Sequence, residues 1–254
     1  MMKNAVVTGA SRGIGLAVVR ELVAAGYRVV AGARTVSAEL KAATPLTSPV
    51  DLTSPEGPDR LIRHALAELG GVDLLVNNVG GGGTRPGGFL SVTDEDWRRT
   101  LDLTLYSTIR ATRAALPSIL ERRGQVVNIG SVNARLPGVA VLDYSAAKAA
   151  LVNLGKSLAE EFGPRGVRIN TISPGPVRTE VWTAPGSVGD HLAAQAGVPI
   201  GELVERMPEL MGSSTGRFTE PAEVGALVVF LASGKAPNIS GSDLVIDGGM
   251  VKTV

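Results

Sequence analysis

The feature that most restricts the fold lies near the N-terminus, where residues 8–15 read TGASRGIG directly after the apolar run Asn4–Thr8. The segment that follows carries apolar side chains at helical spacing, so the turn joins a buried strand to an amphipathic helix. In such a turn Gly9 lets the chain bend sharply, Gly13 lets the backbone approach a pyrophosphate, and Gly15 lets helix and strand pack closely. The helix N-terminus then attracts phosphate charge. A glycine-rich turn can be only a tight connection, but the strand and helix around it predict a dinucleotide-binding unit.

Short apolar runs alternate with longer helical segments along the chain, which is typical of an α/β protein with a parallel sheet. The runs are rich in Val, Ile and Leu, as strands covered on both faces must be. The predicted strands are Asn4–Thr8, Arg28–Ala31, Asp73–Val76, Gln125–Ile129, Val167–Ile172 and Leu244–Ile246, with a weaker strand ending at Val50. Besides the helix after the glycine turn, the predicted helices cover residues 94–122, 143–162 and 221–232. We therefore expect a doubly wound, Rossmann-type parallel sheet of about seven strands with helices on both faces.

Residues 180–218 differ from the rest of the chain. They contain several glycines and prolines, no clear strand and only a weakly helical stretch around residues 191–211, so we interpret them as a substrate lid outside the sheet. No linker composition divides the chain, and residues 1–254 are expected to form a single domain. The apolar side chains of the lid would either cover a hydrophobic substrate or, as is more common, form ordinary core. They are Val181, Trp182, Leu192, Val198, Ile200, Leu203, Met207, Leu210 and Met211.

Composition removes several kinds of site and partner. The sequence has no cysteine, which excludes disulfides and thiolate ligands, and its 2 histidines are too few for a histidine-rich site, so we expect no metal. Its 25 Lys and Arg balance 24 Asp and Glu without a basic block, so nucleic acid is not an expected partner. The N-terminal segment turns glycine-rich too early for a signal peptide, and no apolar run of about 18 residues follows. We therefore expect a soluble cytoplasmic protein with no membrane association.

The glycine turn and later motifs together resemble the classical short-chain dehydrogenase/reductase family. The turn has the family's spacing, Thr-Gly-x-x-x-Gly-x-Gly, and the later motifs stand in order at the ends of predicted strands or the starts of helices. They are Asp51, Asn77-Asn78-Val79-Gly80, Ser131, Tyr144-x-x-x-Lys148, Pro174-Gly175 and Asp247-Gly248-Gly249. Each motif alone is weak evidence, whereas their joint occurrence along the whole chain is specific. The resemblance implies an oxidoreductase that interconverts a small-molecule carbonyl compound and an alcohol, and a homo-oligomer, commonly a tetramer or dimer.

Basic residues indicate NADP(H) rather than NAD(H) as the cofactor. At the end of the second strand a carboxylate would bind the ribose 2′-OH of NAD, whereas an arginine accommodates a 2′-phosphate. Arg34 stands about 20 residues beyond Gly15, and no Asp or Glu lies between Tyr27 and Ser37. Arg12, inside the glycine turn, could bind the same phosphate with its guanidinium fork. Either arginine could instead be a solvated surface charge.

The resemblance implies the remaining cofactor contacts. The glycine turn would hold the pyrophosphate, the segment after the third strand would flank the adenine, and the segment after the fourth would line the adenosine ribose. The loop after the sixth strand would bind the nicotinamide amide. The implied residues are Gly9, Ser11, Arg12, Gly13, Ile14 and Gly15, then Asp51 and Leu52, then Asn78, Val79 and Gly80, and finally Pro174, Gly175, Val177 and Thr179. From the sequence alone, Asp51 could also cap a turn, and the Pro-Gly pair could be an ordinary turn.

Tyr144 and Lys148 stand four residues apart among good helix formers, so their side chains leave one helix face about one turn apart. Because an ammonium favours a nearby phenolate, we expect Lys148 to lower the pKa of Tyr144 from its unperturbed value of ~10. Tyr144 would exchange a proton with the substrate, and by resemblance Lys148 would also hydrogen-bond the nicotinamide ribose. Ser131 lies 13 residues before Tyr144 and matches the family serine that hydrogen-bonds the substrate oxygen. Taken alone, Ser131 could simply cap the next turn.

One position departs from the family pattern. The helix after the fourth strand usually carries an asparagine, which is thought to support a water chain that returns protons to the lysine and tyrosine, but here Thr104 stands there. A threonine hydroxyl can still bond a water, although it lacks the two donors of an amide. We include Thr104 in the catalytic set and expect reduced turnover. A non-enzymatic NADP(H)-binding sensor or scaffold is the alternative function, and Thr104 is its only sequence hint.

A glycine-rich loop continues beyond the fourth-strand motif. Gly81 to Gly83 and Arg85 extend it toward the expected mouth of the substrate site. This loop adds little to the choice of substrate, and the sequence does not identify which carbonyl compound is used.

Overall fold

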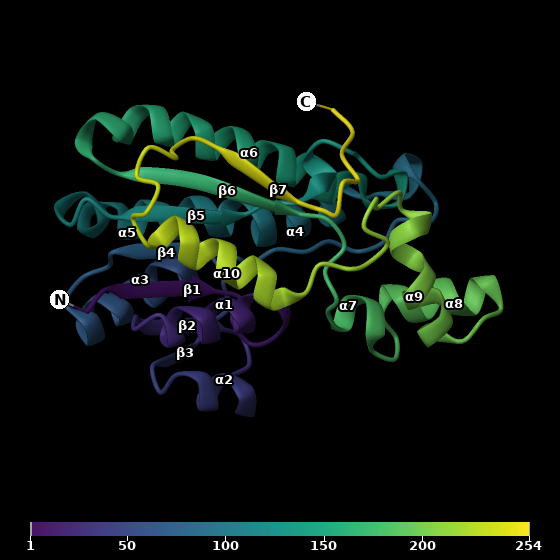
Figure 1. Ribbon diagram of the computed structural model, residues 1–254, viewed down its shortest axis with the longest axis horizontal. Helices are drawn as coiled ribbons and strands as arrows, with labels where there is room; N and C mark the ends of the chain where they lie inside the picture. The colour runs from purple at the N-terminus through teal and green to yellow at the C-terminus, as the bar shows by residue number, and fades with distance from the viewer. Residues whose placement is uncertain (1, 254) are drawn as a thin grey trace.

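The computed structural model describes residues 2–253, which form a seven-stranded parallel sheet in the order β3-β2-β1-β4-β5-β6-β7 (Figure 1). The strands are β1 (Asn4–Thr8), β2 (Arg28–Ala33), β3 (Thr47–Pro49), β4 (Leu74–Asn77), β5 (Gln125–Ile129), β6 (Arg168–Pro174) and β7 (Asp243–Ile246). The order reverses between β1 and β4, and ligands of such sheets bind beyond the carboxyl ends of the strands at this reversal. The doubly wound α/β fold and all seven expected strands are confirmed.

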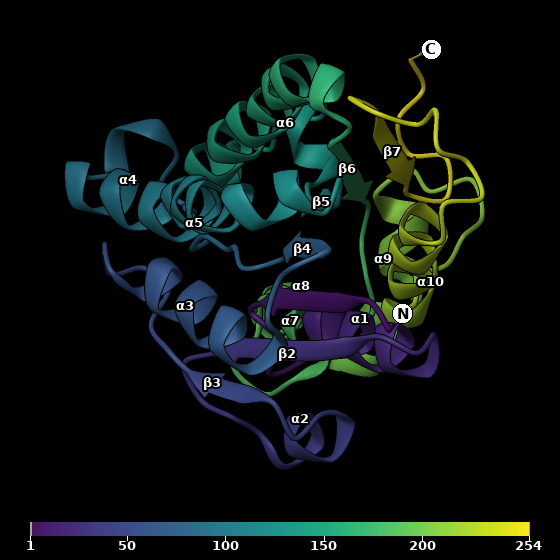
Figure 2. The same ribbon diagram turned by 90° about the vertical axis from the view of Figure 1, so that its left-hand side faces the viewer.

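Helices cover both faces of the sheet (Figure 2). One face carries α1 (Gly13–Ala24), α2 (Ala38–Ala43) and α10 (Pro221–Ala232), and the other carries α3 (Gly57–Leu69), α5 (Ser107–Glu121) and α6 (Leu142–Phe162). Alternate residues of a strand therefore enter different cores. Val7 packs in the core on the α1 side, whereas Val6 packs in the core on the α3 side. This two-sided burial explains why the strands read as continuous apolar runs.

The helix expected over residues 94–122 is interrupted. The structure contains α4 (Asp94–Leu101), a π-helical turn η2 (Asp102–Tyr106) and then α5. Side-chain hydroxyls bond backward within this region, since Ser107 donates to the carbonyl of Leu103 and Thr108 to that of Thr104. Single π-helical turns inside helices occur frequently at functional sites. The apolar spacing of the sequence did not reveal the turn, because its flanking segments keep helical periodicity.

Residues 180–218 form three helices that gather at one end of the molecule, outside the sheet (Figure 1). They are α7 (Glu180–Thr183), α8 (Val188–Ala196) and α9 (Ile200–Leu210). Their apolar side chains mostly pack on one another in a small separate core that includes Leu203, Met207 and the buried Phe218. Val181, Leu210 and Met211 are exposed instead. Core packing, the more common role of such residues, therefore describes most of this segment.

Short 3₁₀ turns lie between the longer helices and strands. The 3₁₀ turns are η1 (Phe89–Ser91), η3 (Val132–Ala134), η4 (Val139–Val141) and η5 (Gly163–Arg165). Within residues 2–253, none of the helices is both long enough and apolar enough to cross a bilayer.

Candidate active site

A cleft of about 520 Å³ opens beyond the carboxyl ends of the central strands, where the strand order reverses. Its walls come from the glycine turn, the loops after β4, β5 and β6, the first turns of α6, and the start of the segment 180–218. The predicted site residues that line it are Gly9, Arg12, Gly13, Ile14, Gly15, Asn78, Gly80, Ser131, Tyr144, Lys148, Pro174, Gly175, Val177 and Thr179. The fold thus brings most of the candidate residues into one cavity.

Six predicted site residues lie outside this lining. They are Ser11, Arg34, Asp51, Leu52, Val79 and Thr104. Leu52 is buried in the core on the α3 side. Asp51 caps the turn before α3, because one carboxylate oxygen accepts hydrogen bonds from the backbone and hydroxyl of Thr53 at 3.0 and 2.8 Å. These bonds lower the pKa of Asp51, to which the nearby Arg34 also contributes. The turn-capping role is thus real, and adenine contact at Asp51 stays a prediction.

The structure adds lining residues that the sequence did not single out. They are Thr84, Ile129, Gly130, Val132, Asn133, Val141 and Val188. Several are immediate neighbours of Ser131, so their place at the end of β5 was the available signal. The others reach the cleft only through loop geometry, and their residue types carry no chemical signature.

The glycine turn is shaped for close backbone approach. Gly9 and Gly13 have φ values of +64° and +54°, in the region that glycine adopts at low cost. A Cβ on Gly15 would lie 2.3 Å from the carbonyl oxygen of Gly9, so only glycine fits there. The amide of Asn78 donates to the same carbonyl at 2.9 Å and ties the end of β4 to the turn. Asn78 therefore holds the shape of the turn, besides lining the cleft.

Arg12 has a partner across the mouth of the cleft. Its guanidinium lies 2.9 Å from the carboxylate of Glu180, at the start of α7, and the two side chains are 70% and 56% exposed. Such an exposed pair contributes little stability, typically below about 1 kcal/mol. Arg12 is therefore available to exchange this carboxylate for another anion.

Lys148 is fully buried and donates a hydrogen bond from Nζ to the carbonyl oxygen of Ile129 at 2.6 Å. Its ammonium lies 5.6 Å from the centre of the Tyr144 ring. Burial lowers the pKa of Lys148 to about 8, because the charged form loses its hydration. The two side chains share one face of α6, as their spacing predicts.

The pKa of Tyr144 differs from the value expected from the sequence. Burial raises the pKa of the phenol above its usual value, and a hydrogen bond with Ser131 opposes this shift. The expected lowering by Lys148 is therefore wrong for this structure. Desolvation dominates, since Lys148 is itself desolvated and directs its ammonium at the carbonyl of Ile129.

Ser131 has a structural role beside its place in the cleft. Its hydroxyl accepts from the backbone N–H of Asn133 and donates to the Oδ1 atom of Asn133, both at 3.1 Å. The serine thus caps η3, as the simpler interpretation of the sequence held. Capping and cleft lining coincide, because the cap fixes the hydroxyl beside Tyr144.

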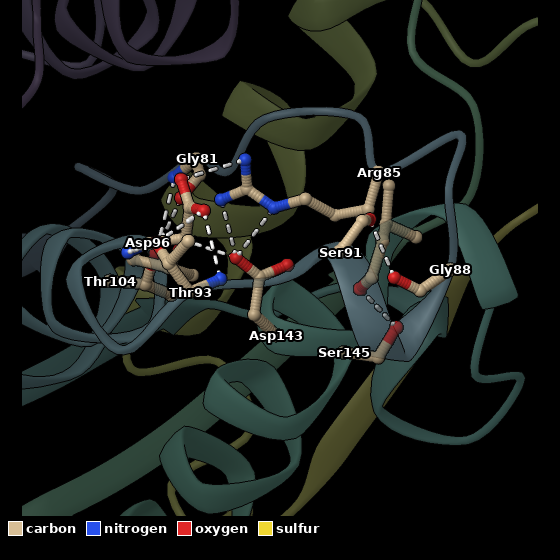
Figure 3. A network of polar contacts seen from close by, with 11 residues as sticks. Gly81, Arg85, Gly88, Ser91, Thr93, Asp96, Thr104, Asp143 and Ser145 are labelled. Atoms are coloured by element: carbon tan, nitrogen blue, oxygen red, sulfur yellow. Dashed lines mark hydrogen bonds and ion pairs between the residues drawn. The ribbon is translucent and has the colours of Figure 1, made fainter.

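Thr104 lies fully buried in the π-helical turn, and Figure 3 shows its side chain beside Gly81. Its hydroxyl donates to the carbonyl oxygen of Gly81 at 3.0 Å and accepts from the N–H of Gly81 at 3.2 Å. A hydroxyl has only one proton to donate. Its one proton is therefore used on Gly81, and Thr104 anchors the loop after β4.

Across residues 2–253, no three or more His, Asp and Glu side chains gather in a way that could hold a metal ion. The ionisable groups of the cleft are instead Tyr144, Lys148 and the Arg12–Glu180 pair. This arrangement suits proton transfer and anion binding.

Comparisons with known proteins agree with this architecture. Residues 9–251 match the family model described as enoyl-(acyl carrier protein) reductase. The 3-oxoacyl-(acyl carrier protein) reductase of Vibrio cholerae is 33% identical over 98% of this chain and 97% of its own length. The acetoacetyl-CoA reductase of Rhizobium meliloti is 36% identical over 98% of both chains.

Solved structures show the same likeness in three dimensions. The L-sorbose reductase of Gluconobacter frateurii, complexed with NADPH and L-sorbose, has a TM-score of 0.91 and 31% identity, covering 100% of this chain and 98% of that chain. An NADPH-bound short-chain oxidoreductase of Pseudomonas aeruginosa PAO1, described as containing an atypical catalytic center, has a TM-score of 0.87 and 31% identity over 99% and 98% of the two chains. The matching motifs, the strand order and these relatives together show that the chain belongs to the classical short-chain dehydrogenase/reductase family.

Proposed function

We propose that this protein is an NADP(H)-dependent oxidoreductase that interconverts a ketone or aldehyde and an alcohol, with Tyr144 as the general acid and base. The observation that carries the proposal is the grouping of Ser131, Tyr144 and Lys148 in a cleft that begins at the glycine turn. The curated relatives support it, because their names describe reductases of carbonyl compounds. The cytoplasmic location and the homo-oligomer stay predictions.

The residues of the cleft fit a dinucleotide. The backbone of Gly9 and Gly13 presents no side chain, and a Cβ at Gly13 would be crowded by the Thr179 side chain at 3.2 Å. The turn would hold the pyrophosphate, and Arg34 with Arg12 would bind the 2′-phosphate. When bound, NADPH supplies the hydride. The NADPH complex of the sorbose reductase supports this choice of cofactor.

The family resemblance implies further contacts with the adenosine and the nicotinamide of the cofactor, some of them by residues outside the cleft lining. Asp51 and Leu52 would flank the adenine, and residues 78–80 would line its ribose. Pro174, Gly175, Val177 and Thr179 line the cleft, and we propose that they bind the nicotinamide amide. Lys148 would then hydrogen-bond the nicotinamide ribose, beside the phenol that it accompanies on α6.

The proton chemistry follows from burial. A phenol with a raised pKa stays protonated near neutral pH, so Tyr144 is ready to donate a proton to a carbonyl oxygen as it becomes an alcohol. Lys148, with a pKa of about 8, is mostly charged at pH 7 and can return a proton to the site. Ser131 would turn its hydroxyl from Asn133 to the substrate oxygen. These states favour reduction of the carbonyl near pH 7.

The substrate side of the cleft is mainly apolar. Its wall includes Val141, Val181, Trp182, Val188 and Met211. We infer that the substrate carries an apolar group beside its carbonyl. Among the relatives' substrates, a short 3-oxoacyl thioester fits this wall better than a sugar.

The test monitors the absorbance of NADPH as it is oxidised in the presence of candidate substrates. These are acetoacetyl-CoA, L-sorbose and a set of aliphatic ketones and aldehydes. We expect turnover with NADPH to exceed that with NADH. Tyr144→Phe should lower kcat about 100- to 10,000-fold, the usual contribution of a general acid, with NADPH affinity retained. Tight NADPH binding without turnover on any substrate would favour the sensor or scaffold, and failure to bind NADPH would overturn both functions.

A further inference from the structure

The loop after β4 presses directly on the catalytic helix. A Cβ on Gly82 would lie 3.0 Å from the Cβ of Tyr144, and a Cβ on Gly80 would lie 3.2 Å from Nζ of Lys148. Real Cβ atoms rarely approach other atoms so closely, which means that the loop backbone is packed against both catalytic side chains. Gly80, Gly81 and Gly82 therefore form the wall of the cleft that faces Tyr144, and their position sets the room left for a substrate.

Arg85 anchors the far end of this loop. Its Nη2 and Nε atoms donate to Oδ2 of Asp143 at 2.7 and 3.3 Å, and its Nη1 atom lies 3.2 Å from Asp96 of α4 (Figure 3). Its backbone N–H donates to the carbonyl of Ala140 at 2.7 Å. Asp143 directly precedes Tyr144 in the first turn of α6. One arginine therefore joins the loop, α4 and the start of the catalytic helix.

The ion pair between Arg85 and Asp143 is withdrawn from solvent. The Asp143 side chain is 0% exposed and that of Arg85 is 15% exposed. Thr100 donates to the same Oδ2 atom at 2.7 Å, and among residues 2–253 no group bonds the buried Oδ1 atom. Removal of one partner of a buried pair is costly, because the remaining charge has lost both water and counter-ion. The Asp143 carboxylate therefore depends on Arg85 for its counter-ion, and the contact also holds the adjacent Tyr144 in place.

We propose that Arg85 is a positioning residue, which clamps the loop after β4 onto the first turn of α6 and so fixes the wall of the substrate site against Tyr144. This role rests on the proposed oxidoreductase function. Arg85 does not line the cleft, so it acts through the loop and Asp143 and not on the substrate. The planar fork of arginine is needed to reach two carboxylates in fixed directions, which a lysine ammonium does not reproduce.

The test compares four variants with the unmodified protein, using NADPH and acetoacetyl-CoA or whichever panel substrate is turned over. They are Arg85→Gln, Arg85→Lys, Asp143→Asn and the double variant Arg85→Gln/Asp143→Asn. We expect Arg85→Gln to lower kcat about 10- to 100-fold and to raise the substrate KM, since small displacements at a reacting centre have effects of this size. The Kd of NADPH, measured by fluorescence, should change less than about twofold, because the glycine turn is not touched by Arg85.

Arg122→Gln is the matched control. Arg122 pairs with Asp73 at 3.3 Å, with side chains 35% and 19% exposed, and this pair also joins two elements but lies at the amino ends of the strands. We expect the control to lose thermal stability and keep kcat. Equal loss of kcat in Arg85→Gln and the control, at equal loss of melting temperature, would overturn the positioning role. Additive losses of kcat in the double variant would overturn it as well, because residues that act through one contact are not additive.

Two further outcomes complete the test. If Arg85→Gln does not fold, Arg85→Lys decides the question: a kcat about 3- to 10-fold below that of the unmodified protein supports the role, and an unchanged kcat and KM overturn it. If the unmodified protein binds NADPH but turns over no substrate, the proposed function fails and the positioning role falls with it. Turnover by the unmodified protein together with control-like behaviour of the Arg85 variants removes the positioning role alone.

Discussion

The two halves of the cleft are built in different ways. The half at the glycine turn is made of backbone, where Gly9, Gly13 and Gly15 leave no room for side chains and Asn78 braces the turn. The half around Tyr144 and Lys148 is made of side chains whose charge states depend on their surroundings, as for the buried Lys148. The first half depends on local geometry and the second on tertiary environment. Mutations should therefore act on the first half through steric crowding and on the second half through changes in burial and charge.

The largest loss of stability is expected from a substitution in the half of the cleft at the glycine turn. Gly15→Ala places a Cβ 2.3 Å from the carbonyl oxygen of Gly9, which is rigid backbone. We expect a loss of at least about 3 kcal/mol in the free energy of unfolding, the upper end of overpacking costs, measured by urea denaturation.

Gly201→Ala is the matched control for this substitution. Gly201 is also helical, in α9, and a Cβ there meets nothing within 4 Å. Alanine should stabilise it by up to about 1 kcal/mol through helix propensity. Similar effects of the two substitutions would show that the crowding at Gly15 is not what restricts it.

The second prediction concerns the charge of Lys148, in the other half of the cleft. The folded protein holds the pKa of Lys148 at about 8, below the ordinary 10.5, so the charged form is penalised at neutral pH. Below pH 8 this penalty is fully present, and it disappears as pH rises from 8 to 10.5, because the folded state then binds fewer protons than the unfolded state. We expect Lys148→Met to be more stable than the unmodified protein at pH 7, with a difference that shrinks by roughly 3 kcal/mol toward pH 10.5.

Urea denaturation of both proteins at pH 7 and pH 10 measures this difference. Turnover of NADPH should be lost in Lys148→Met at both pH values. A stability difference that does not change with pH would contradict the burial of an ionisable ammonium at this position.

A smaller effect is expected where the two halves meet. Thr104→Val keeps the shape of the side chain but leaves the N–H and carbonyl of Gly81 without their hydroxyl partner. We expect a loss of about 1–3 kcal/mol in stability, the cost of unpaired buried polar groups, together with a lower kcat because the loop loosens. Thr104→Ser should retain most of both. Full stability and activity in Thr104→Val would show that the hydroxyl does not anchor the loop.

The smallest effect on stability is expected at the mouth of the cleft. Arg12→Gln removes the exposed pair with Glu180, so the free energy of unfolding should change by less than about 1 kcal/mol. The affinity for NADPH should nevertheless fall several-fold more than that for NADH, since only NADPH carries the 2′-phosphate. Isothermal titration with both cofactors measures the ratio. An equal loss for both would assign Arg12 to the pyrophosphate or to Glu180.

Much of the fold could be predicted from residue patterns. Val, Ile and Leu runs marked the strands because strands covered on both faces must be apolar, and the TGASRGIG turn marked the first βα unit because only glycine tolerates its contacts. The π-helical turn at Thr104 escaped prediction, since one added residue per turn does not disturb apolar periodicity over so short a segment. Cleft residues such as Thr84, Val141 and Val188 escaped it because only loop geometry places them there.

The sequence by itself determined the order of the strands' apolar runs, the glycine turn and the presence of Tyr144 and Lys148 on one helix face, because these depend on contacts close along the chain. Only the tertiary structure decided that burial raises the pKa of Tyr144, that Thr104 holds Gly81, and that Arg85 reaches Asp143. Desolvation and ion pairing are set by which distant segments come together, and that information is not contained in local spacing.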